Sequence, residues 1–354
     1  NLLRMSVYQI KYMDAVPDSA VCNEAVKLAK RHKFAQLSGF VNGVLRNIAR
    51  NIDSVQFDTL SIQYSMPQWI VDRFVAAYGE KKAEEIFKAF HSKSTISIRT
   101  NLTRCTPDEL RVMLEAEGVT VTAVDELNYA FVISGFDYLN GLQSFRDGLF
   151  YVQDISSMLV AQTAAPKKGD YVIDVCAAPG GKSTHIAELL QGSGHVLARD
   201  LTDNKVDMIE ENIERHGLNN MSAEVWDATV FDADSAGKAD ILICDLPCSG
   251  LGVLGRKKDI RYKMTPESVD EIAALQRQIL DTVHTYVKPN GVLVYSTCTI
   301  DEAENEDNVR WFIEKHPEFE LDKSFAEGTG MKQILPGEHG SDGFFIARFI
   351  KSKL

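Results

Sequence analysis

Apolar strand-like runs alternate with helical segments through the second half of the chain, and this alternation restricts the fold more than any other feature. Strands are predicted at residues 171–175, 195–199, 223–226, 239–244 and 291–296, with helices at 181–190, 203–215 and 266–287. This spacing indicates an α/β fold with a mostly parallel, doubly wound sheet. The last apolar run, residues 343–350, is expected to end the sheet as an antiparallel edge strand.

The first 150 residues have a different pattern. Residues 1–50 place apolar side chains at helical spacing, which predicts a small helical bundle. A helix running to Tyr78 follows, and Thr106 to Glu109 form a capping box that opens another helix between short strands. We therefore predict three domains: an all-helical domain at 1–58, a small α+β domain at 59–150 and the α/β domain at 151–354.

The charge distribution does not exclude a polyanionic partner, although the net charge is -12. Residues 1–104 carry 15 lysines and arginines against 9 acidic residues, and the local field steers a polyanion. No apolar run approaches the ~18 residues of a membrane-spanning helix. Six cysteines in a large chain without an export signal favour reduced thiols. We expect a cytoplasmic monomer without membrane attachment, and an incomplete first domain because the chain begins at Asn1.

The first site signal is the loop after the first predicted strand of the sheet, Asp174-Val175-Cys176-Ala177-Ala178-Pro179-Gly180-Gly181-Lys182. Its small residues let backbone amides approach a ligand, and the following helix N-terminus adds positive potential. A nucleotide-like cofactor binds at this turn in open sheets, so 176–182 are candidate cofactor-binding residues. The loop contains neither a dinucleotide fingerprint nor a Walker A sequence. Asp200 and Asp227, after the next two strands, are placed to accept hydrogen bonds from ribose hydroxyls and an adenine amino group.

Two further loops each carry a cysteine just after a strand. Cys248 lies in Asp245-Leu246-Pro247-Cys248, after the fourth strand, and Cys298 follows the fifth. Adjacent strand ends of a doubly wound sheet face one crevice, so the two thiols should meet there. Zinc is the rival explanation, but further ligands at metal spacing are missing, and we predict no metal. We interpret the other cysteines as packing residues: Cys22, Cys105, Cys176 and Cys244.

These strings resemble the RNA 5-methylcytosine methyltransferases, which show D-x-C-A-A-P-G-G-K, D-A-P-C-S and T-C-[ST] in this order. The similarity covers essentially all of 151–354, and 335–337 with 342–345 match the last motif of the family. Residues 21–46 resemble the second half of a NusB-like domain, a fusion typical of the ribosomal RNA small-subunit methyltransferase B group, also called Sun or Fmu. The chain departs from the family at Leu246, Gly255 and Lys258, where Ala, Arg and Pro are usual, so we expect altered RNA contacts there.

The resemblance implies a Rossmann-like class I domain that uses S-adenosyl-L-methionine to methylate carbon 5 of a cytosine in 16S ribosomal RNA, releasing S-adenosyl-L-homocysteine. It assigns the nucleophile that adds to carbon 6 to Cys298 and the elimination step to Cys248. Asp245 is implied to contact the cofactor and the target base. From the residues alone, the roles of the two thiols remain interchangeable. Lys182 is either a charge that lowers the pKa of a nearby thiol or a surface lysine of the cofactor loop.

A basic run with one aromatic residue follows Cys248. Such a run can hold phosphates and a stacked base, so we predict RNA contacts from Arg256, Lys257, Lys258, Arg261 and Tyr262. A solvated charged face is the alternative. The basic segment 66–104 is the second expected contact surface for the ribosomal RNA partner.

Three other functions compete with this interpretation. A nicotinamide-dependent redox enzyme would share the doubly wound sheet, but the dinucleotide fingerprint is missing. A non-catalytic RNA-binding assembly factor is suggested by the NusB-like front, yet such a protein has no need for two strand-end cysteines with cofactor acids. The same chemistry on a transfer RNA cytosine stays open, as does the identity of the modified cytosine.

Overall fold

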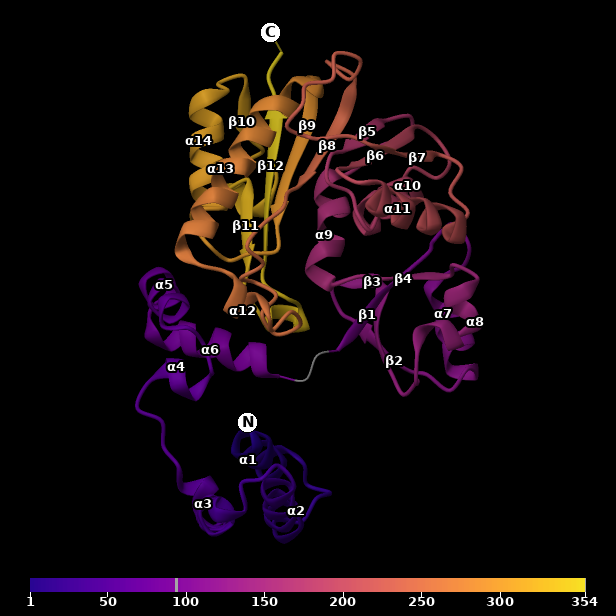
Figure 1. Cartoon of the computed structure of the whole chain (residues 1–354). Helices are drawn as coiled ribbons and strands as arrows, with labels where there is room; N and C mark the ends of the chain where they lie inside the picture. Colours follow the sequence, from indigo (N-terminus) through magenta and orange to yellow (C-terminus); the bar gives the residue numbers. More distant parts are fainter. Residues whose placement is uncertain (93–94, 354) are drawn as a thin grey trace. The chain divides into compact units, whose positions relative to one another are not determined.

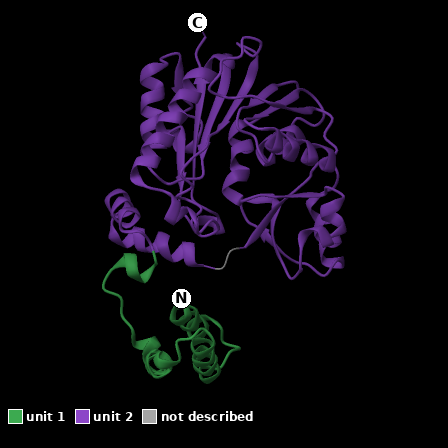
Figure 2. Cartoon of the chain, in the orientation of Figure 1, with its two compact units in different colours: residues 1–65 green, residues 66–354 purple. Residues whose placement is uncertain are grey.

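The computed structural model describes residues 1–92 and 95–353. Their contacts divide the chain into two compact units, residues 1–65 and 66–354 (Figure 2). The division falls at residue 65, whereas the sequence pattern places it at 58, and it keeps the predicted α+β and α/β domains within one unit. Among the described residues, no helix is both long and apolar enough to cross a membrane.

The first unit is a helical bundle, as predicted for residues 1–50. It consists of α1 (Leu2–Tyr12), α2 (Asp18–Arg31) and α3 (Ser38–Asn51), with the short helices η1 (Ala35–Leu37), η2 (Ile52–Ser54) and α4 (Leu60–Gln63). The apolar residues at helical spacing pack together in one core: Cys22, Ala25, Ala29, Val41 and Leu45. Cys22 is therefore a packing residue, as we predicted.

Two helices open the second unit. Helix α5 (Gln68–Tyr78) ends at Gly79, as predicted, and α6 (Glu80–His91) folds back so that Phe74 and Phe87 stack at 5.7 Å. The Tyr78 hydroxyl donates to the backbone oxygen of Ile300 at 2.6 Å, and Arg73 forms an ion pair with Asp301. These contacts attach the helix pair to the segment that follows Cys298.

A four-stranded antiparallel sheet in the order β2-β3-β1-β4 comes next. Its strands are β1 (Ile96–Thr100), β2 (Thr120–Val124), β3 (Leu127–Ser134) and β4 (Phe150–Val152). Helix α7 (Pro107–Ala116) begins with the predicted capping box of Thr106 and Glu109; the short η3 (Leu139–Gly141) and α8 (Gln143–Arg146) follow. The sequence pattern did not reveal β4, a strand of three residues.

The larger sheet has eight strands in the order β10-β12-β9-β8-β5-β6-β7, with β11 paired to β12 (Figure 1). Five neighbouring strands, which reach the edge of the sheet at β7, are parallel: β5 (Tyr171–Asp174), β6 (His195–Asp200), β7 (Met221–Val225), β8 (Ala239–Asp245) and β9 (Val287–Thr297). Strand β12 (Phe344–Lys351) pairs antiparallel with β9, as predicted. β10 (Phe319–Leu321) and β11 (Met331–Ile334) are additions that the sequence pattern did not reveal.

Helices cover both faces of this sheet, which confirms the doubly wound α/β fold (Figure 1). One core contains apolar residues of α13 (Pro266–Val283) and α14 (Glu306–Lys315), and the other contains those of α9 (Ile155–Ala164), α10 (Gly181–Leu189) and α11 (Asp203–His216). The consecutive residues Val172 and Ile173 face opposite cores, as the period of a buried strand requires. The remaining short helices are α12 (Ile260–Lys263), η4 (His284–Tyr286), η5 (Ala326–Gly328) and η6 (Glu338–Gly340).

The boundary between α13 and β9 differs from the sequence prediction. The helix predicted at 266–287 ends at Val283, a 3-10 turn follows, and β9 already begins at Val287. Tyr286 and Val287 are both fully buried. Packing of these two side chains under the sheet overrides the local preference for helix.

Candidate active site

A cavity of about 280 Å³ opens at the carboxyl ends of β5, β8 and β9. The strand-end loops and the segment after β4 both contribute to it, and its lining residues are Tyr151, Val152, Gln153, Asp154, Ser156, Ser157, Asp174, Cys176, Ala177, Ala178, Pro179, Gly181, Lys182, Asp245, Val253, Lys257, Cys298, Asp342 and Phe344. The volume lies near the lower end of the range for small-molecule sites. The structure thus brings most of the predicted loop 176–182 to one pocket with Asp245 and Cys298.

The loop after β5 is held in place by β6. The Ala177 amide donates to the backbone oxygen of Arg199 at 2.8 Å, and the Ala178 amide donates to Asp200 Oδ2 at 2.9 Å. Gly180 has a φ of 103°, which glycine adopts without strain, and α10 begins at the next residue. The turn therefore presents a helix N-terminus to the cavity.

The two predicted thiols meet. The sulfur atoms of Cys248 and Cys298 lie 3.1 Å apart, and Cys298 lines the cavity. The pKa of the Cys298 thiol is lowered by its hydrogen bond with Cys248, and the charge of Lys182 adds to this lowering while burial opposes it. The same hydrogen bond, together with burial, raises the pKa of Cys248. The pair therefore favours a thiolate at Cys298 and a neutral thiol at Cys248.

A chain of polar contacts fixes Asp245 beside the thiols. Lys182 Nζ forms an ion pair with Asp245 Oδ2 at 2.6 Å, and the Ser296 hydroxyl donates to Asp245 Oδ1 at 2.7 Å. Burial acts to lower the pKa of Lys182, but the pairing with Asp245 outweighs it, so the pKa is raised. Lys182 therefore stays charged near Cys298 and is not the solvent-exposed surface lysine of the alternative interpretation.

Another acidic group of the pocket, Asp174, is fully buried. Burial raises its pKa to about 7, with the hydrogen bond from Ser183 opposing and the charge of Asp245 adding to the shift. Around neutral pH this carboxyl group is therefore divided between its protonated and ionised forms.

Buried side chains that the sequence analysis missed hold the loop of Cys248 and the loop of Cys298. The Glu304 carboxylate accepts from the Ser249 amide at 2.8 Å, and Gln276 Nε2 donates to the Pro247 carbonyl at 2.8 Å. The loop of Cys298 is fixed by Asn305, which accepts from the Thr297 hydroxyl at 2.6 Å. Glu304 and Asn305 lie in an acidic run soon after Cys298, a pattern that resembles a solvated turn.

The two predicted adenosine acids are placed differently from each other. Asp200 is 4% exposed, and its carboxylate already accepts from two backbone amides and pairs with Lys205 at 2.8 Å. Asp227 is exposed, and its Oδ1 accepts from the amide and hydroxyl of Thr229. Neither lines the cavity. Asp200 therefore holds the loop 176–182 through the Ala178 amide, whereas Asp227 stabilises only the turn that contains Thr229.

The predicted RNA-binding residues differ in their exposure. Lys257, Lys258 and Tyr262 are exposed, and Lys257 lines the cavity. Arg261, in contrast, is 5% exposed and donates to the backbone oxygen of Leu254 at 3.2 Å. The prediction that Arg261 contacts RNA is wrong, because its guanidinium is buried and holds the loop through the backbone oxygen of Leu254.

Arg256 is held between two carboxylates of the cavity. Its guanidinium lies 3.0 Å from Asp154 Oδ2 and 2.6 Å from Asp342 Oδ2. Burial and the neighbouring Asp154 raise the pKa of Asp342 to about 6, while Arg256 opposes the shift. Arg256 thus joins the basic run to the rim of the pocket.

One group of possible metal ligands occurs among the described residues, and it lies away from the cavity lining. Ligand atoms of Asp281, His284 and His316 lie within 4.8 Å of one another. Lys315 Nζ already pairs with Asp281 at 2.8 Å. A cation would have to displace this ammonium group, so the donor set does not favour a metal.

The comparisons with known proteins agree with this geometry. The model of the 16S rRNA methyltransferase RsmB/F family matches residues 161–350, the NusB family model matches 1–50, and the ferredoxin-like domain of RsmF/B-like methyltransferases matches 66–136. A probable ribosomal RNA small subunit methyltransferase B of Bacillus subtilis is 38% identical over 99% of this chain and 82% of its own length. A Synechocystis protein of the same description is 33% identical with the same coverage.

Solved structures give the same result. The crystal structure of PH0851 superposes with a TM-score of 0.82 at 28% identity, over 99% of this chain and 81% of that chain. NSun6 from Pyrococcus horikoshii, solved with SFG, gives a TM-score of 0.74 at 25% identity, over 81% of this chain and 99% of that one. The resemblance drawn from the sequence motifs is confirmed: the chain belongs to the 16S rRNA methyltransferase RsmB/F family.

Proposed function

We propose that this protein transfers a methyl group from S-adenosyl-L-methionine to carbon 5 of a cytosine in small-subunit ribosomal RNA, through a covalent bond between Cys298 and carbon 6. The observation that carries the proposal is the pair of sulfur atoms 3.1 Å apart beside the ion pair of Lys182 and Asp245. Family membership supports the ribosomal RNA substrate and the S-adenosyl-L-methionine donor.

The cavity fits this cofactor in its donor set. The N-terminus of α10 at Gly181 and Lys182 faces the cavity, and the carboxylates of Asp174 and Asp245 suit a ligand with cationic sulfonium and amino groups. When bound, S-adenosyl-L-methionine supplies an electrophilic methyl group. The relative NSun6 was solved with SFG, an analogue of this cofactor, which agrees with the assignment.

Cys298 performs the covalent step. Carbon 5 of cytosine is a weak nucleophile, but addition of a thiolate to carbon 6 moves the electron pair of the 5,6 double bond to carbon 5. Carbon 5 would then take the methyl group, with S-adenosyl-L-homocysteine as the leaving group. Water takes the carbon 5 proton, and the electron pair of that bond restores the double bond as the sulfur–carbon 6 bond breaks and Cys298 leaves as a thiolate. The lowered pKa of Cys298 provides the thiolate that begins this sequence.

Cys248 assists the release. Its raised pKa keeps the proton on its sulfur, 3.1 Å from the sulfur that must depart. A hydrogen bond from Cys248 stabilises the Cys298 thiolate as the bond to carbon 6 breaks. Loss of Cys248 should therefore slow elimination more than addition.

Asp245 and the exposed basic residues act on the RNA. Lys182 and Ser296 hold both carboxylate oxygens of Asp245, so the group is oriented to accept from the cytosine amino edge. Lys257, Lys258 and Tyr262 lie on the exposed basic run beside the pocket and are proposed to contact phosphates and a base. Two reduced thiols at this distance suit the cytoplasm, where we propose that the enzyme acts.

Trapping the covalent adduct tests this proposal. Small-subunit RNA made with 5-fluorocytosine blocks loss of a proton from carbon 5, so the enzyme stays attached to the RNA. With S-adenosyl-L-methionine present, mass spectrometry should find the RNA on the peptide of Cys298, and none with Cys298→Ala. An adduct on Cys248 would reverse the two roles, and the absence of any adduct from the wild type would refute covalent catalysis.

A further inference from the structure

Strand β4 and the segment that follows it line the cavity, and Tyr151 of β4 is their largest side chain. A Cβ added at Gly181 would lie 3.0 Å from Tyr151 Cε1, so the ring packs directly against the first residue of α10. The Tyr151 hydroxyl donates to the Pro179 carbonyl at 3.2 Å. Asn212 donates to the same carbonyl at 2.9 Å. Tyr151 therefore contacts the loop 176–182 at Pro179 and at Gly181, the two residues next to Gly180.

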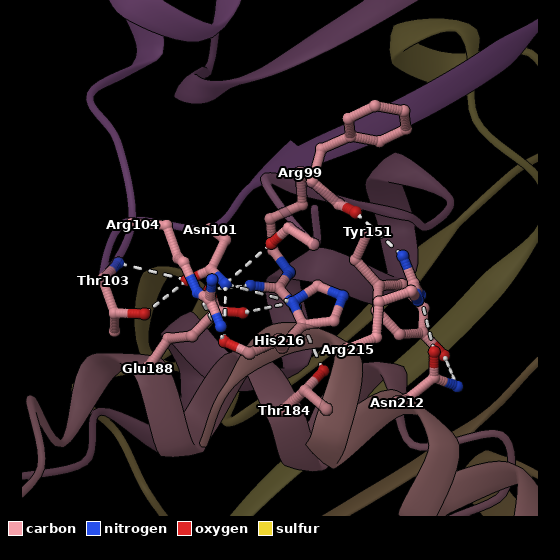
Figure 3. A network of polar contacts seen from close by, with 12 residues as sticks. Arg99, Asn101, Thr103, Arg104, Tyr151, Thr184, Glu188, Asn212, Arg215 and His216 are labelled. Carbon is pink, nitrogen blue, oxygen red and sulfur yellow. Dashed lines mark hydrogen bonds and ion pairs between the residues drawn. The ribbon is translucent and has the colours of Figure 1, made fainter. Parts of the chain in front are cut away.

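The Tyr151 ring is itself held by charged and aromatic groups. The guanidinium groups of Arg99 and Arg215 each lie 5.8 Å from its centroid, and the His216 ring lies 5.3 Å away (Figure 3). Tyr151 is 6% exposed, and burial raises its pKa to about 12. Its orientation is thus fixed by β1 from one side and by α11 from the other.

Arg99 also connects β1 to α10. It is completely buried and forms an ion pair with Glu188, while its Nη2 lies 3.1 Å from the Thr184 hydroxyl and its Nε 2.9 Å from Gln153 Oε1 (Figure 3). Thr184 and Glu188 lie one and two turns after Gly181 on the same helix. A buried ion pair contributes little net stability over an apolar pair, but it fixes geometry.

We propose that Tyr151 is a positioning residue for the cofactor: the four-stranded sheet, through Arg99 of β1 and Tyr151 of β4, sets the geometry of the turn 179–182. This inference rests on the proposed binding of S-adenosyl-L-methionine in the cavity. It gives the four-stranded sheet a role besides the proposed RNA contact, because the eight-stranded sheet and its helices alone lack one wall of the cofactor site. Ordinary packing of a domain junction is the competing explanation.

Cofactor affinity without RNA separates the two explanations. Titration calorimetry with S-adenosyl-L-homocysteine on the full chain should show about tenfold weaker binding for Tyr151→Ala, because the wall of the turn is removed. Tyr151→Phe keeps the ring and loses one hydrogen bond, so about threefold is expected. The KM for RNA should stay unchanged in both variants.

A double-mutant cycle with Gly181→Ala measures the contact itself. In the wild-type background the new methyl group meets the tyrosine ring, and binding should weaken by about threefold or more. In the Tyr151→Ala background the space is free, so Gly181→Ala should cause no additional loss. An equal loss in both backgrounds would overturn the proposal. If Tyr151→Ala does not fold, Tyr151→Leu takes its place in the cycle.

Phe145→Ala provides the matched control. This aromatic side chain packs on the Arg215 guanidinium at 4.3 Å in the same junction but does not line the cavity. It should lower the melting temperature and leave S-adenosyl-L-homocysteine affinity unchanged. An affinity loss equal to that of Tyr151→Ala would assign the effect to junction packing. Wild-type protein that does not bind S-adenosyl-L-homocysteine would overturn the cofactor assignment as well, whereas unchanged affinity in Tyr151→Ala would overturn the positioning role alone.

Discussion

The cavity has two walls of different origin. The thiol wall, formed by the loops that follow β5, β8 and β9, comes from the strand ends of one parallel sheet and includes the thiol of Cys298 and the ion pair of Lys182 and Asp245. The tyrosine wall, formed by residues 151–157, comes from the other sheet and the segment that follows it. Its contacts are held by buried groups at a domain junction. The difference indicates that the groups that react and the groups that position them are supplied by separate parts of the fold.

The two walls also differ in how their charges are used. On the thiol wall, Lys182 and Asp245 are paired at the rim of the pocket and keep some exposure. Behind the tyrosine wall, Arg99 and Glu188 are almost completely removed from solvent. The ion pair proposed to act in the reaction, Lys182 with Asp245, is partly exposed and can be reached by a substrate. The ion pair at the domain junction, Arg99 with Glu188, is buried and cannot be reached. Substitutions in the two places should therefore change different measurements.

The largest effect is expected on the thiol wall. Cys298→Ala removes the nucleophile, so methyl transfer to RNA should fall by on the order of 10³-fold or more. Binding of S-adenosyl-L-homocysteine should change little, since the side chain becomes only smaller. Labelled methyl transfer and calorimetry measure the two quantities separately. Retained turnover would show that the other thiol, Cys248, can begin the reaction.

The next effect concerns stability behind the tyrosine wall. Arg99→Met leaves Glu188 buried without its partner, which should destabilise the second unit by about 3–5 kcal/mol. The double variant Arg99→Met/Glu188→Leu should recover most of this loss, because an apolar pair of similar size replaces the ions. Urea unfolding followed by fluorescence measures both.

An exposed pair serves as the control for this prediction. Lys263 and Asp259 form an ion pair 2.7 Å long with both side chains well exposed. Lys263→Ala should leave the unfolding transition unchanged, because water screens such a pair. If Arg99→Met were equally neutral, the junction would not depend on its buried charges.

A third test follows the pH dependence of the thiols. The pKa of Cys298 lies below its ordinary value, so the reactive thiolate forms at lower pH than in a free cysteine, and alkylation should rise with pH to an early plateau. Cys248→Ala removes the hydrogen-bond donor, so the midpoint should move to higher pH. Iodoacetamide labelling of the Cys298 peptide, measured across pH, gives both midpoints. A midpoint unaffected by Cys248→Ala would contradict the pairing.

The smallest effects are expected at the exposed basic run. Lys257→Ala and Lys258→Ala should each weaken RNA binding modestly and reduce the slope of log affinity against log salt by about 1. Cofactor affinity should not change. Filter binding at several salt concentrations measures the slope, and a slope equal to that of the wild type would remove these lysines from the RNA interface.

The thiol wall was predictable because its residues follow strands in short strings. The loop 174–182, the Cys248 loop and Cys298 each lie directly after a strand, and the topology of a parallel sheet brings strand ends together. No local pattern reveals the tyrosine wall. Arg99 and Glu188 are 89 positions apart, and β4, which carries Tyr151, has only three residues. Long-range contacts of this kind depend on packing between domains rather than on periodicity.

Charge runs were the other source of error. Arg261 belongs to the exposed-looking basic run but is buried, because α12 turns its side chain under the loop. Glu304 belongs to an acidic run that resembles a solvated turn, yet it is completely buried and holds the loop of Cys248. In both cases the burial of one member of a charged run depends on tertiary structure.

Release of the proton from carbon 5 tests the central claim most directly. Small-subunit ribosomal RNA made with tritium at carbon 5 of its cytosines is incubated with the protein and S-adenosyl-L-methionine carrying a carbon-14 methyl group. The account predicts one tritium released to water for each methyl group transferred, with all carbon-14 in 5-methylcytidine. Methyl transfer with the tritium retained, or carbon-14 in another nucleoside, would contradict it.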